Sequence, residues 1–216
     1  MKKKVAIVAG ASGLVGRHLT EKLIADESYE AIYIIGRRNS THKSSKITFY
    51  ESDFNSFPSL TIDNQIDFFC TLGTTIKKAK TQENFKKIDY HAVVKLAKWA
   101  DELKAKNFTV ISSVGANKNS RNFYLRTKGE MESKIRQYKI DNITFIRPSL
   151  ITGKRDEFRF GEKLGEYFLM IFGILFIGSL KKYKPISAEK IASKMIFYAS
   201  KNKSNISIIE GKALHS

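Results

Sequence analysis

The sequence predicts an α/β protein built on a doubly wound parallel sheet of about seven strands. Three observations support this prediction. Short apolar runs alternate with helical patterns along all 216 residues. Several of these runs are apolar throughout, as is typical of strands that helices cover on both faces. A glycine-rich run also lies between the first expected strand and the first expected helix. We therefore expect one domain over residues 1–216 with right-handed crossovers.

Each expected strand is a short apolar run bounded by polar or turn-forming residues. In chain order these runs are Lys4–Ala9, Ala31–Ile35, Lys46–Tyr50, Asp67–Leu72, Phe108–Ser112, Ile143–Ile146 and Ile206–Ile209. Helices are expected over Leu14–Ala25, from about Gln82 to Lys104, from about Asn122 to Tyr138, and from Ser187 onward. In the second helix apolar residues recur at near-helical spacing and Thr81 stands at the expected N-cap, so we predict one continuous helix there.

The composition is that of a globular protein. Hydrophobic residues make up 42% of the chain, which excludes a mostly disordered or collagen-like protein. Cys70 is the only cysteine and the four histidines are scattered, so we expect neither a disulfide framework nor a metal site. The net charge of +17 comes largely from lysines dispersed along the chain. Because surfaces that read nucleic acids favour arginines grouped on one face, we expect no nucleic-acid partner.

Two segments imitate targeting or membrane signals. Lys2–Lys4 precede an apolar run that ends at Gly10, which is too short for the core of a signal peptide. Tyr167–Leu180 carries no charged residue, yet it is shorter than the roughly 20 residues that a membrane span requires. We interpret it as a buried helix, a lid over a pocket or an interfacial segment. The sequence thus predicts a cytoplasmic protein with no integral membrane span.

The glycine-rich run Gly10–Gly16 is the first motif that carries chemistry. Glycines spaced in this way allow a tight turn and a close approach of the backbone to a pyrophosphate, and the following helix N-terminus offers free N–H groups to the anion. An ordinary strand-to-helix turn is the alternative, but the position at the first such junction favours a dinucleotide-binding loop. The residues that we expect to bind the cofactor here are Gly10, Ser12, Gly13, Leu14 and Val15.

Two arginines at the end of the second expected strand bear on which cofactor is bound. A site that selects NAD places Asp or Glu about 20 residues beyond the glycine loop, to bind the ribose 2′-hydroxyl. At that position the chain has Arg37 and Arg38, with no carboxylate nearby. Guanidinium groups can pair with a 2′-phosphate. The sequence therefore predicts NADP (NADPH) in preference to NAD, although a solvated loop in a basic protein would look the same.

A tyrosine and a lysine four residues apart form the second motif. On the helix expected from about Asn122, Tyr124 and Lys128 share one face, so a phenol and an ammonium can address one ligand. Such a pair arises easily by chance, but Ser112 and Ser113 end the fifth expected strand shortly before it. A hydroxyl, a phenol and a lysine should thus meet at the carboxyl edge of the sheet, where open α/β sheets bind ligands.

At this point the chain resembles the short-chain dehydrogenase/reductases, whose fold is Rossmann-like. The glycine loop, Leu72–Thr75, Ser112-Ser113, Tyr124 to Lys128 and Arg147–Ser149 occur in the order of that superfamily. The glycine spacing is similar to that of its extended and atypical branches, and the stretch around the serines and the tyrosine looks closest to the atypical group that contains the Tat-interacting oxidoreductase. The resemblance covers nearly the whole chain.

The resemblance implies a role for each matching residue. Tyr124 would be the general acid or base at the substrate, Lys128 would hold the nicotinamide ribose and stabilise the phenolate, and Ser113 would polarise the reacting oxygen, with Ser112 left open as the alternative. Leu72, Gly73 and Thr74 would pass beneath the adenine and ribose. Asp53 would accept from the adenine amino group. Pro148 and Ser149 would line the nicotinamide side, and residues 150–190 would form a substrate-side cap.

One departure from the family pattern concerns the fourth helix. Many relatives have an asparagine there, whereas the chain reads Lys87-Ile88-Asp89-Tyr90-His91, which puts a proton relay through that position in doubt. The resemblance implies an NADPH-dependent reductase of a small-molecule carbonyl compound. The sequence leaves the oligomeric state open, with a homodimer through exposed helices as one option. The alternative is a regulatory protein that senses NADP(H). Sugar-nucleotide epimerisation is disfavoured, because little chain follows Arg147-Pro148 to hold a nucleotide diphosphate.

Overall fold

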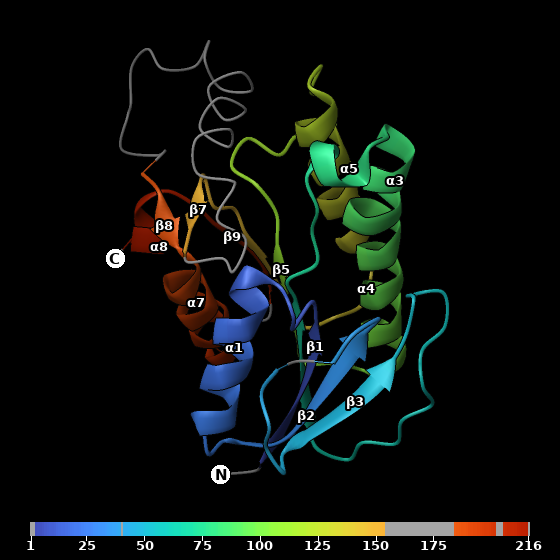
Figure 1. The fold of residues 1–216 in the computed structure, drawn as a ribbon, viewed down its shortest axis with the longest axis vertical. Coiled ribbons are helices and arrows are strands. Elements are labelled where there is room, and N and C mark those ends of the chain that lie inside the picture. Colours follow the sequence, from blue (N-terminus) through green and yellow to red (C-terminus); the bar gives the residue numbers. More distant parts are fainter. Residues whose placement is uncertain (1–2, 40, 154–183, 202–204, 216) are drawn as a thin grey trace.

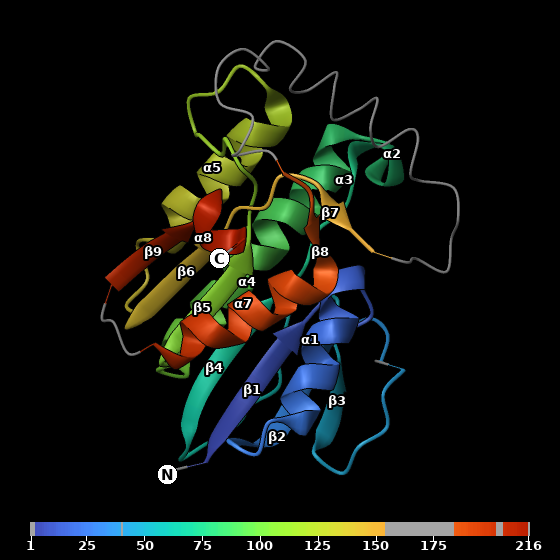
Figure 2. The same ribbon diagram turned by 90° about the vertical axis from the view of Figure 1, so that its left-hand side faces the viewer.

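The computed structural model describes residues 3–39, 41–153, 184–201 and 205–215. Its central sheet contains the strands β1 (Lys4–Ala9), β2 (Tyr29–Gly36), β3 (Ile47–Glu51), β4 (Gln65–Cys70), β5 (Asn107–Ile111), β6 (Asn142–Ile146) and β9 (Asn205–Ile209). They are all parallel, in the order β3-β2-β1-β4-β5-β6-β9 (Figures 1 and 2). This confirms the predicted doubly wound sheet and its seven strands, with end points that differ by one or two residues.

The order of the strands creates a switch point beside β1. The chain builds outward from β1 through β2 to β3 and then returns to place β4 on the other side of β1. The loops that follow β1 and β4 therefore leave the sheet in opposite directions, which opens a crevice at their carboxyl ends. These carboxyl ends form the upper edge of the sheet in Figure 2.

Helices cover both faces of the sheet (Figures 1 and 2). On one face lie α1 (Leu14–Ala25) and α7 (Ala188–Ser200), and on the other lie α4 (Val93–Glu102) and α5 (Phe123–Ile135). Short helices α2 (Ile76–Ala79) and α8 (Lys212–His215) were not predicted. Each face has its own apolar core. Residues of the core beneath α1 and α7 include Leu19, Leu23, Ile32, Phe69 and Met195. Residues of the core beneath α4 and α5 include Phe68, Trp99, Phe108, Met131 and Phe145.

The helix expected from Gln82 to Lys104 is not one α-helix. It begins as α3 (Gln82–Lys86), continues as the π-helical turn η1 (Lys87–Ala92) and ends as α4. The predicted N-cap is confirmed, because the Thr81 hydroxyl accepts a hydrogen bond from the Asn84 amide at 3.1 Å. The predicted helical stretch is confirmed over residues 82–102. The π-helical turn within it was not predicted, because one turn with i→i+5 hydrogen bonds has no distinct sequence pattern.

The predicted cap lies mostly outside the described residues. Of the range 150–190, the structure describes the ends, where β7 (Ile151–Thr152) pairs in parallel with β8 (Ile186–Ser187) as a separate two-stranded sheet. The uncharged stretch Tyr167–Leu180 falls outside them, so its interpretation as a helix, a lid or an interfacial segment stays a prediction. Within the described part of the chain, none of the helices is long and apolar enough to cross a membrane.

A buried carboxylate joins four strands at the amino edge of the sheet. The Asp67 carboxylate accepts hydrogen bonds from the Tyr29 hydroxyl at 2.7 Å and the Asn107 side-chain amide at 2.5 Å. The ammonium of Lys4 lies 3.7 Å from it. Burial, together with the neighbouring Asp67 charge, raises the pKa of Tyr29 well above its usual value, so this phenol remains a donor. The cluster stabilises the edge opposite the crevice.

We expect Asp67→Asn to lower the free energy of unfolding by about 2 kcal/mol, because hydrogen bonds to a buried charge are lost while their donors stay buried. Chemical denaturation of the purified protein measures this. Asp63→Asn is the matched control: its carboxylate is exposed, and the change should stay within about 0.5 kcal/mol. Equal losses in the two variants would contradict the role of Asp67.

Candidate active site

The glycine loop between β1 and α1 is closed by close backbone contacts. Gly10 has a φ of +89°, and a Cβ there would lie 2.6 Å from the Thr71 hydroxyl oxygen. A Cβ at Gly16 would overlap the Gly10 carbonyl oxygen. The Gly13 amide donates to that same oxygen at 2.9 Å, which closes the turn. Glycine is therefore required at position 10 because of its positive φ. It is required at position 16 because the helix backbone lies against the loop backbone there.

The N-terminus of α1 suits a pyrophosphate group. Gly13 is the N-cap and has no side chain to accept from the first turn, which also contains no acidic residue. The predicted binding residues Leu14 and Val15 open this turn, and Ser12 is exposed beside it. The N-terminus of α1, a helix of 12 residues, presents unpaired amide N–H groups and the positive end of the helix dipole to an anion. The loop thus fits the dinucleotide that the sequence predicts.

The residues predicted to contact the adenosine half follow β2 and β3. Arg37 and Arg38 are both exposed directly after β2. Asp53, also exposed, follows β3, and its carboxylate accepts hydrogen bonds from the Asn55 amide at 2.9 Å and side chain at 2.6 Å. These hydrogen bonds lower the pKa of Asp53. Contact of these three side chains with a cofactor stays a prediction.

The segment after β4 lies against the helices on the far side of the crevice. Leu72 is half-buried against the core beneath α4 and α5, and Gly73 is exposed. The Thr74 amide donates to the Asp89 carboxylate at 2.8 Å. Asp89 itself is on the π-helical turn η1 and is 1% exposed. The predicted cofactor-side segment is thus tied to a buried acid that the sequence analysis did not select.

Tyr124 and Lys128 both project from α5, as the sequence predicts. The helix begins after Asn122, whose side chain accepts from the Leu125 amide at 3.1 Å. The half-buried Tyr124 ring packs against Phe85 with a centroid distance of 5.7 Å. Lys128 is 3% exposed. The phenol can thus face a ligand while the ammonium is enclosed by protein.

A buried ion pair joins Lys128 to Asp89. The Lys128 ammonium lies 2.7 Å from the Asp89 carboxylate. Burial by itself would lower the pKa of Lys128, but the attraction of Asp89 outweighs it, so the pKa is raised. The sequence analysis noticed the missing asparagine in this region and did not weigh the carboxylate. The signal was available, because an acid on an apolar helix face must find a partner when it is buried.

The two serines after β5 have different partners. Ser112 donates to the Glu132 carboxylate at 2.6 Å. Glu132 also receives a two-pronged interaction from Arg147, at 2.8 Å from Nε and 2.6 Å from Nη2. The Ser113 hydroxyl has only a long contact of 3.3 Å with the Val114 carbonyl oxygen. Ser112 is therefore held in a charged network, and Ser113 is the serine that can readily turn to another acceptor.

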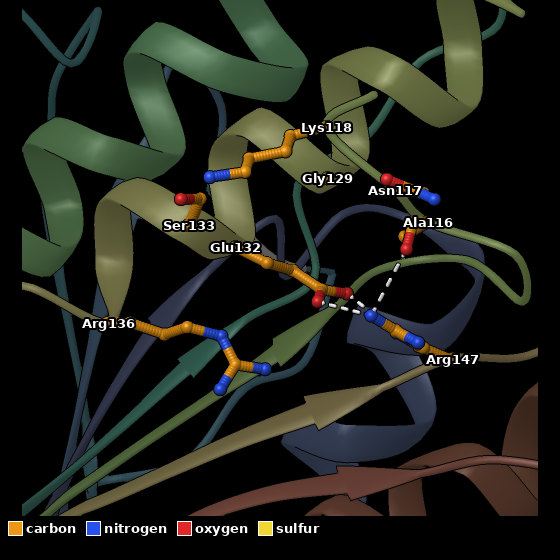
Figure 3. A pocket seen from close by; sticks show the side chains of 8 residues that line it. All are labelled: Ala116, Asn117, Lys118, Gly129, Glu132, Ser133, Arg136 and Arg147. Atoms are coloured by element: carbon orange, nitrogen blue, oxygen red, sulfur yellow. Dashed lines mark hydrogen bonds and ion pairs between the residues drawn. The ribbon is translucent and has the colours of Figure 1, made fainter. Parts of the chain in front are cut away.

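Figure 3 shows this charged network at the wall of a cavity of about 220 Å³. Glu132 on α5 and Arg147 after β6 point toward each other, and Arg147 also donates to the Ala116 carbonyl oxygen at 3.2 Å. The remaining lining residues are Asn117, Lys118, Gly129, Ser133 and Arg136. None of the residues predicted to bind the cofactor or to act in catalysis lines it. The cavity is thus separate from the crevice.

The chain after β6 packs beside the segment that follows β5. Pro148 is buried, and its carbonyl oxygen accepts from the Val114 amide at 3.0 Å. Ser149 donates to the Lys184 carbonyl oxygen at 2.9 Å. These contacts place Pro148 next to the serine segment that follows β5. Because β5 and β6 are neighbours in the sheet, the segments that follow them lie side by side, as the order of the motifs predicts.

Cys70 ends β4 and is fully buried, and burial raises the pKa of its thiol to about 12, so it is not a thiolate at neutral pH. Within the described ranges, His, Cys, Asp and Glu side chains form no group of three or more that could hold a metal ion.

Comparison with known proteins gives consistent matches. The sequence matches the NAD dependent epimerase/dehydratase family over residues 6–168. It is 30% identical over 200 residues to Protein FMP52, mitochondrial, of Debaryomyces hansenii, covering 90% of this chain and 87% of the relative. It is 33% identical over 180 residues to Protein HTATIP2 of Rattus norvegicus, covering 78% and 71% of the two chains. These relatives confirm the resemblance to the atypical, Tat-interacting-protein-like group.

Solved structures share the fold at low sequence identity. The ADP-L-glycero-D-manno-heptose-6-epimerase of Helicobacter pylori superposes with a TM-score of 0.69 at 17% identity, covering 97% of this chain and 77% of that one. MoeE5 in complex with UDP-glucose and NAD superposes with a TM-score of 0.67 at 13% identity, covering 97% and 79%. At such identities the likeness confirms the Rossmann-like fold alone.

The expectation of a cytoplasmic protein was wrong. The FMP52 relatives of Debaryomyces hansenii, Candida glabrata and Candida albicans are all named as mitochondrial proteins. The expectation rested on an apolar run too short for a secretory signal and on the single cysteine, and neither feature separates one reducing compartment from another.

We expect Glu132→Ala to lower the free energy of unfolding by about 3 kcal/mol, because the partly buried Arg147 would lose its bidentate partner and keep the longer contact with Glu210 at 3.4 Å. Thermal and chemical denaturation measure the loss. Glu130→Ala, two residues away on the same helix, removes a more exposed carboxylate that pairs with Lys86 and should cost less than about 1 kcal/mol. A loss at Glu132 no larger than at Glu130 would show that the network does not hold α5.

Proposed function

Because the chain belongs to the NAD dependent epimerase/dehydratase family, we propose that it is an oxidoreductase that uses NADPH to reduce the carbonyl group of a small molecule. The observation that supports this proposal is that Ser113 follows β5 at the carboxyl edge of the sheet, while the half-buried Tyr124 and the buried Lys128 project from one face of α5. A protein that only binds a dinucleotide has no need of a phenol beside an enclosed ammonium.

The binding of the cofactor follows from the groups at the carboxyl edge. The amides at the start of α1 would hold the pyrophosphate, and Leu72 to Thr74 would pass beneath the adenosine half. Arg37 and Arg38 would pair with the 2′-phosphate, since both are exposed at the end of β2 and a guanidinium forms charge-assisted hydrogen bonds with phosphate. Pro148 and Ser149 would line the nicotinamide half.

The chain's own residues would handle the proton. When bound, the reduced cofactor supplies the hydride. The Tyr124 hydroxyl would donate its proton to the carbonyl oxygen of the substrate, and the Ser113 hydroxyl would donate a hydrogen bond to the same oxygen. The Lys128 ammonium would stabilise the phenolate that remains. Ser113 suits this role better than Ser112, whose hydrogen is already directed to Glu132.

We expect the protein to bind NADPH more tightly than NADH, and the Arg37→Ala/Arg38→Ala variant to lose most of this preference. Loss of two charge-assisted contacts should weaken NADPH binding at least about tenfold, or about 1.4 kcal/mol, with NADH binding nearly unchanged. Isothermal titration with each nucleotide measures both constants. Arg136→Ala, which removes an arginine far from the crevice, should change neither. Equal affinities of the unmodified protein for NADPH and NADH would refute the proposed selectivity.

We expect Tyr124→Phe to reduce NADPH oxidation by at least about a hundredfold, a typical contribution of a general acid, while NADPH binding stays intact. The assay follows NADPH absorbance with a panel of aldehydes, ketones and quinones. Tyr138→Phe, beyond the other end of α5, serves as the control and should keep full activity. If the unmodified protein binds NADPH and reduces nothing in a broad panel, the alternative function as an NADP(H)-sensing regulatory protein is favoured instead.

A further inference from the structure

The Asp89 carboxylate has two interactions, and both reach residues of the proposed site. One oxygen lies 2.7 Å from the Lys128 ammonium. The other accepts from the Thr74 amide at 2.8 Å. The carboxylate is thus shared between the helix that carries the proposed acid and the segment that would lie beneath the ribose.

The π-helical turn η1 gives Asp89 this position. A turn closed by i→i+5 hydrogen bonds adds a residue to the helix and changes which side chains face inward. Asp89 and Ala92 are the buried residues of η1, whereas Lys87 and His91 are exposed. Such turns occur often at functional sites, and here the inward residue is an acid.

We propose that Asp89 is a positioning residue that keeps the Tyr124–Lys128 pair fully protonated at alkaline pH, by compensating the Lys128 charge and fixing its ammonium. This inference rests on the proposed function, in which the protonated phenol is the acid. In a site with a neutral residue at 89, the uncompensated ammonium would favour earlier loss of a proton from the pair.

The charges around Lys128 determine the direction of the effect. The titratable groups that bear on it from the surrounding elements are Asp89 on η1, Tyr124 on α5 and Cys70 at the end of β4. The Cys70 thiol is neutral at working pH, since burial raises its pKa to about 12. Among the residues that the structure describes, Asp89 is therefore the negative charge that balances the ammonium.

The Lys128 ammonium and the Tyr124 hydroxyl are coupled. The expected downward shift of the pH at which the pair loses a proton therefore does not depend on which group loses it first. Removing a negative charge from beside Lys128 makes proton loss easier for the ammonium and for the nearby phenol. The first deprotonation belongs to the pair rather than to either residue. Either loss impairs reduction, because the proton donor or its stabilising cation is gone.

The test is the pH profile of the Asp89→Asn variant. With NADPH and 9,10-phenanthrenequinone as the probe, we expect the alkaline limb of kcat/KM to move at least about one pH unit lower than in the unmodified protein. A purely structural role would reduce the rate or the stability without moving the limb, and that result would overturn the proposal. Asp89→Glu, which keeps the charge, should return the alkaline limb most of the way to its position in the unmodified protein.

Asp67→Asn is the matched control, since it also removes a buried carboxylate beside a lysine, at the opposite edge of the sheet. Its alkaline limb should coincide with that of the unmodified protein. If Asp89→Asn does not fold, Asp89→Ser takes its place, because water can enter the space that the smaller side chain leaves. The same downward shift is expected of it, and an unmoved limb would again overturn the proposal.

A measurement without turnover separates this inference from the proposed function. In protein labelled at the tyrosine Cζ carbon, the Tyr124 resonance is assigned by its absence in Tyr124→Phe. Its alkaline transition should begin at lower pH in Asp89→Asn than in the unmodified protein. If that shift is seen while no carbonyl compound is reduced, the proposed reduction fails and the role of Asp89 stands. An unshifted transition refutes the role of Asp89 even in an active enzyme.

Discussion

The helix α5 carries two buried charges one turn apart, and the site depends on their compensation. Lys128 and Glu132 stand at i and i+4, a spacing at which opposite charges pair on an isolated helix. In the folded chain each is paired instead with a group from another element, Lys128 with Asp89 and Glu132 with Arg147. A buried charge without a partner costs several kcal/mol, so α5 is constrained to lie between the π-helical turn and the end of β6.

The two ion pairs also engage different polar groups near the carboxyl edge of the sheet. The Glu132–Arg147 pair engages the Ser112 hydroxyl, whereas the Ser113 hydroxyl makes a long contact of 3.3 Å with the Val114 carbonyl oxygen. The Asp89–Lys128 pair encloses a cation beside the phenol of Tyr124. The exposed Lys118 lines the same cavity as Glu132 and Arg147, but each ion pair is largely buried and holds its own countercharge. Local compensation, and not the overall basic character of the chain, therefore determines the electrostatics of the site.

The sheet supplies the frame within which these pairs act. The switch point beside β1 brings the glycine loop and the segment after β4 to one edge, while the Asp67 cluster stabilises the other edge. Each edge of the sheet thus has a buried carboxylate that accepts hydrogen bonds from neighbouring elements. At the amino edge the carboxylate joins strands. At the carboxyl edge Asp89 joins α5 to the segment after β4.

The sequence by itself determined the seven strands, the first helix and the order of the motifs, because apolar runs, glycine spacing and caps are local features that the folded state preserves. Only the tertiary structure decided the partner of Lys128, the different hydrogen-bond partners of Ser112 and Ser113, and the π-helical turn. The pairing of Asp89 with Lys128 depends on how α5 packs against η1, and no local pattern encodes such a contact. A buried acid indicates that a partner exists, but packing alone determines which residue that partner is.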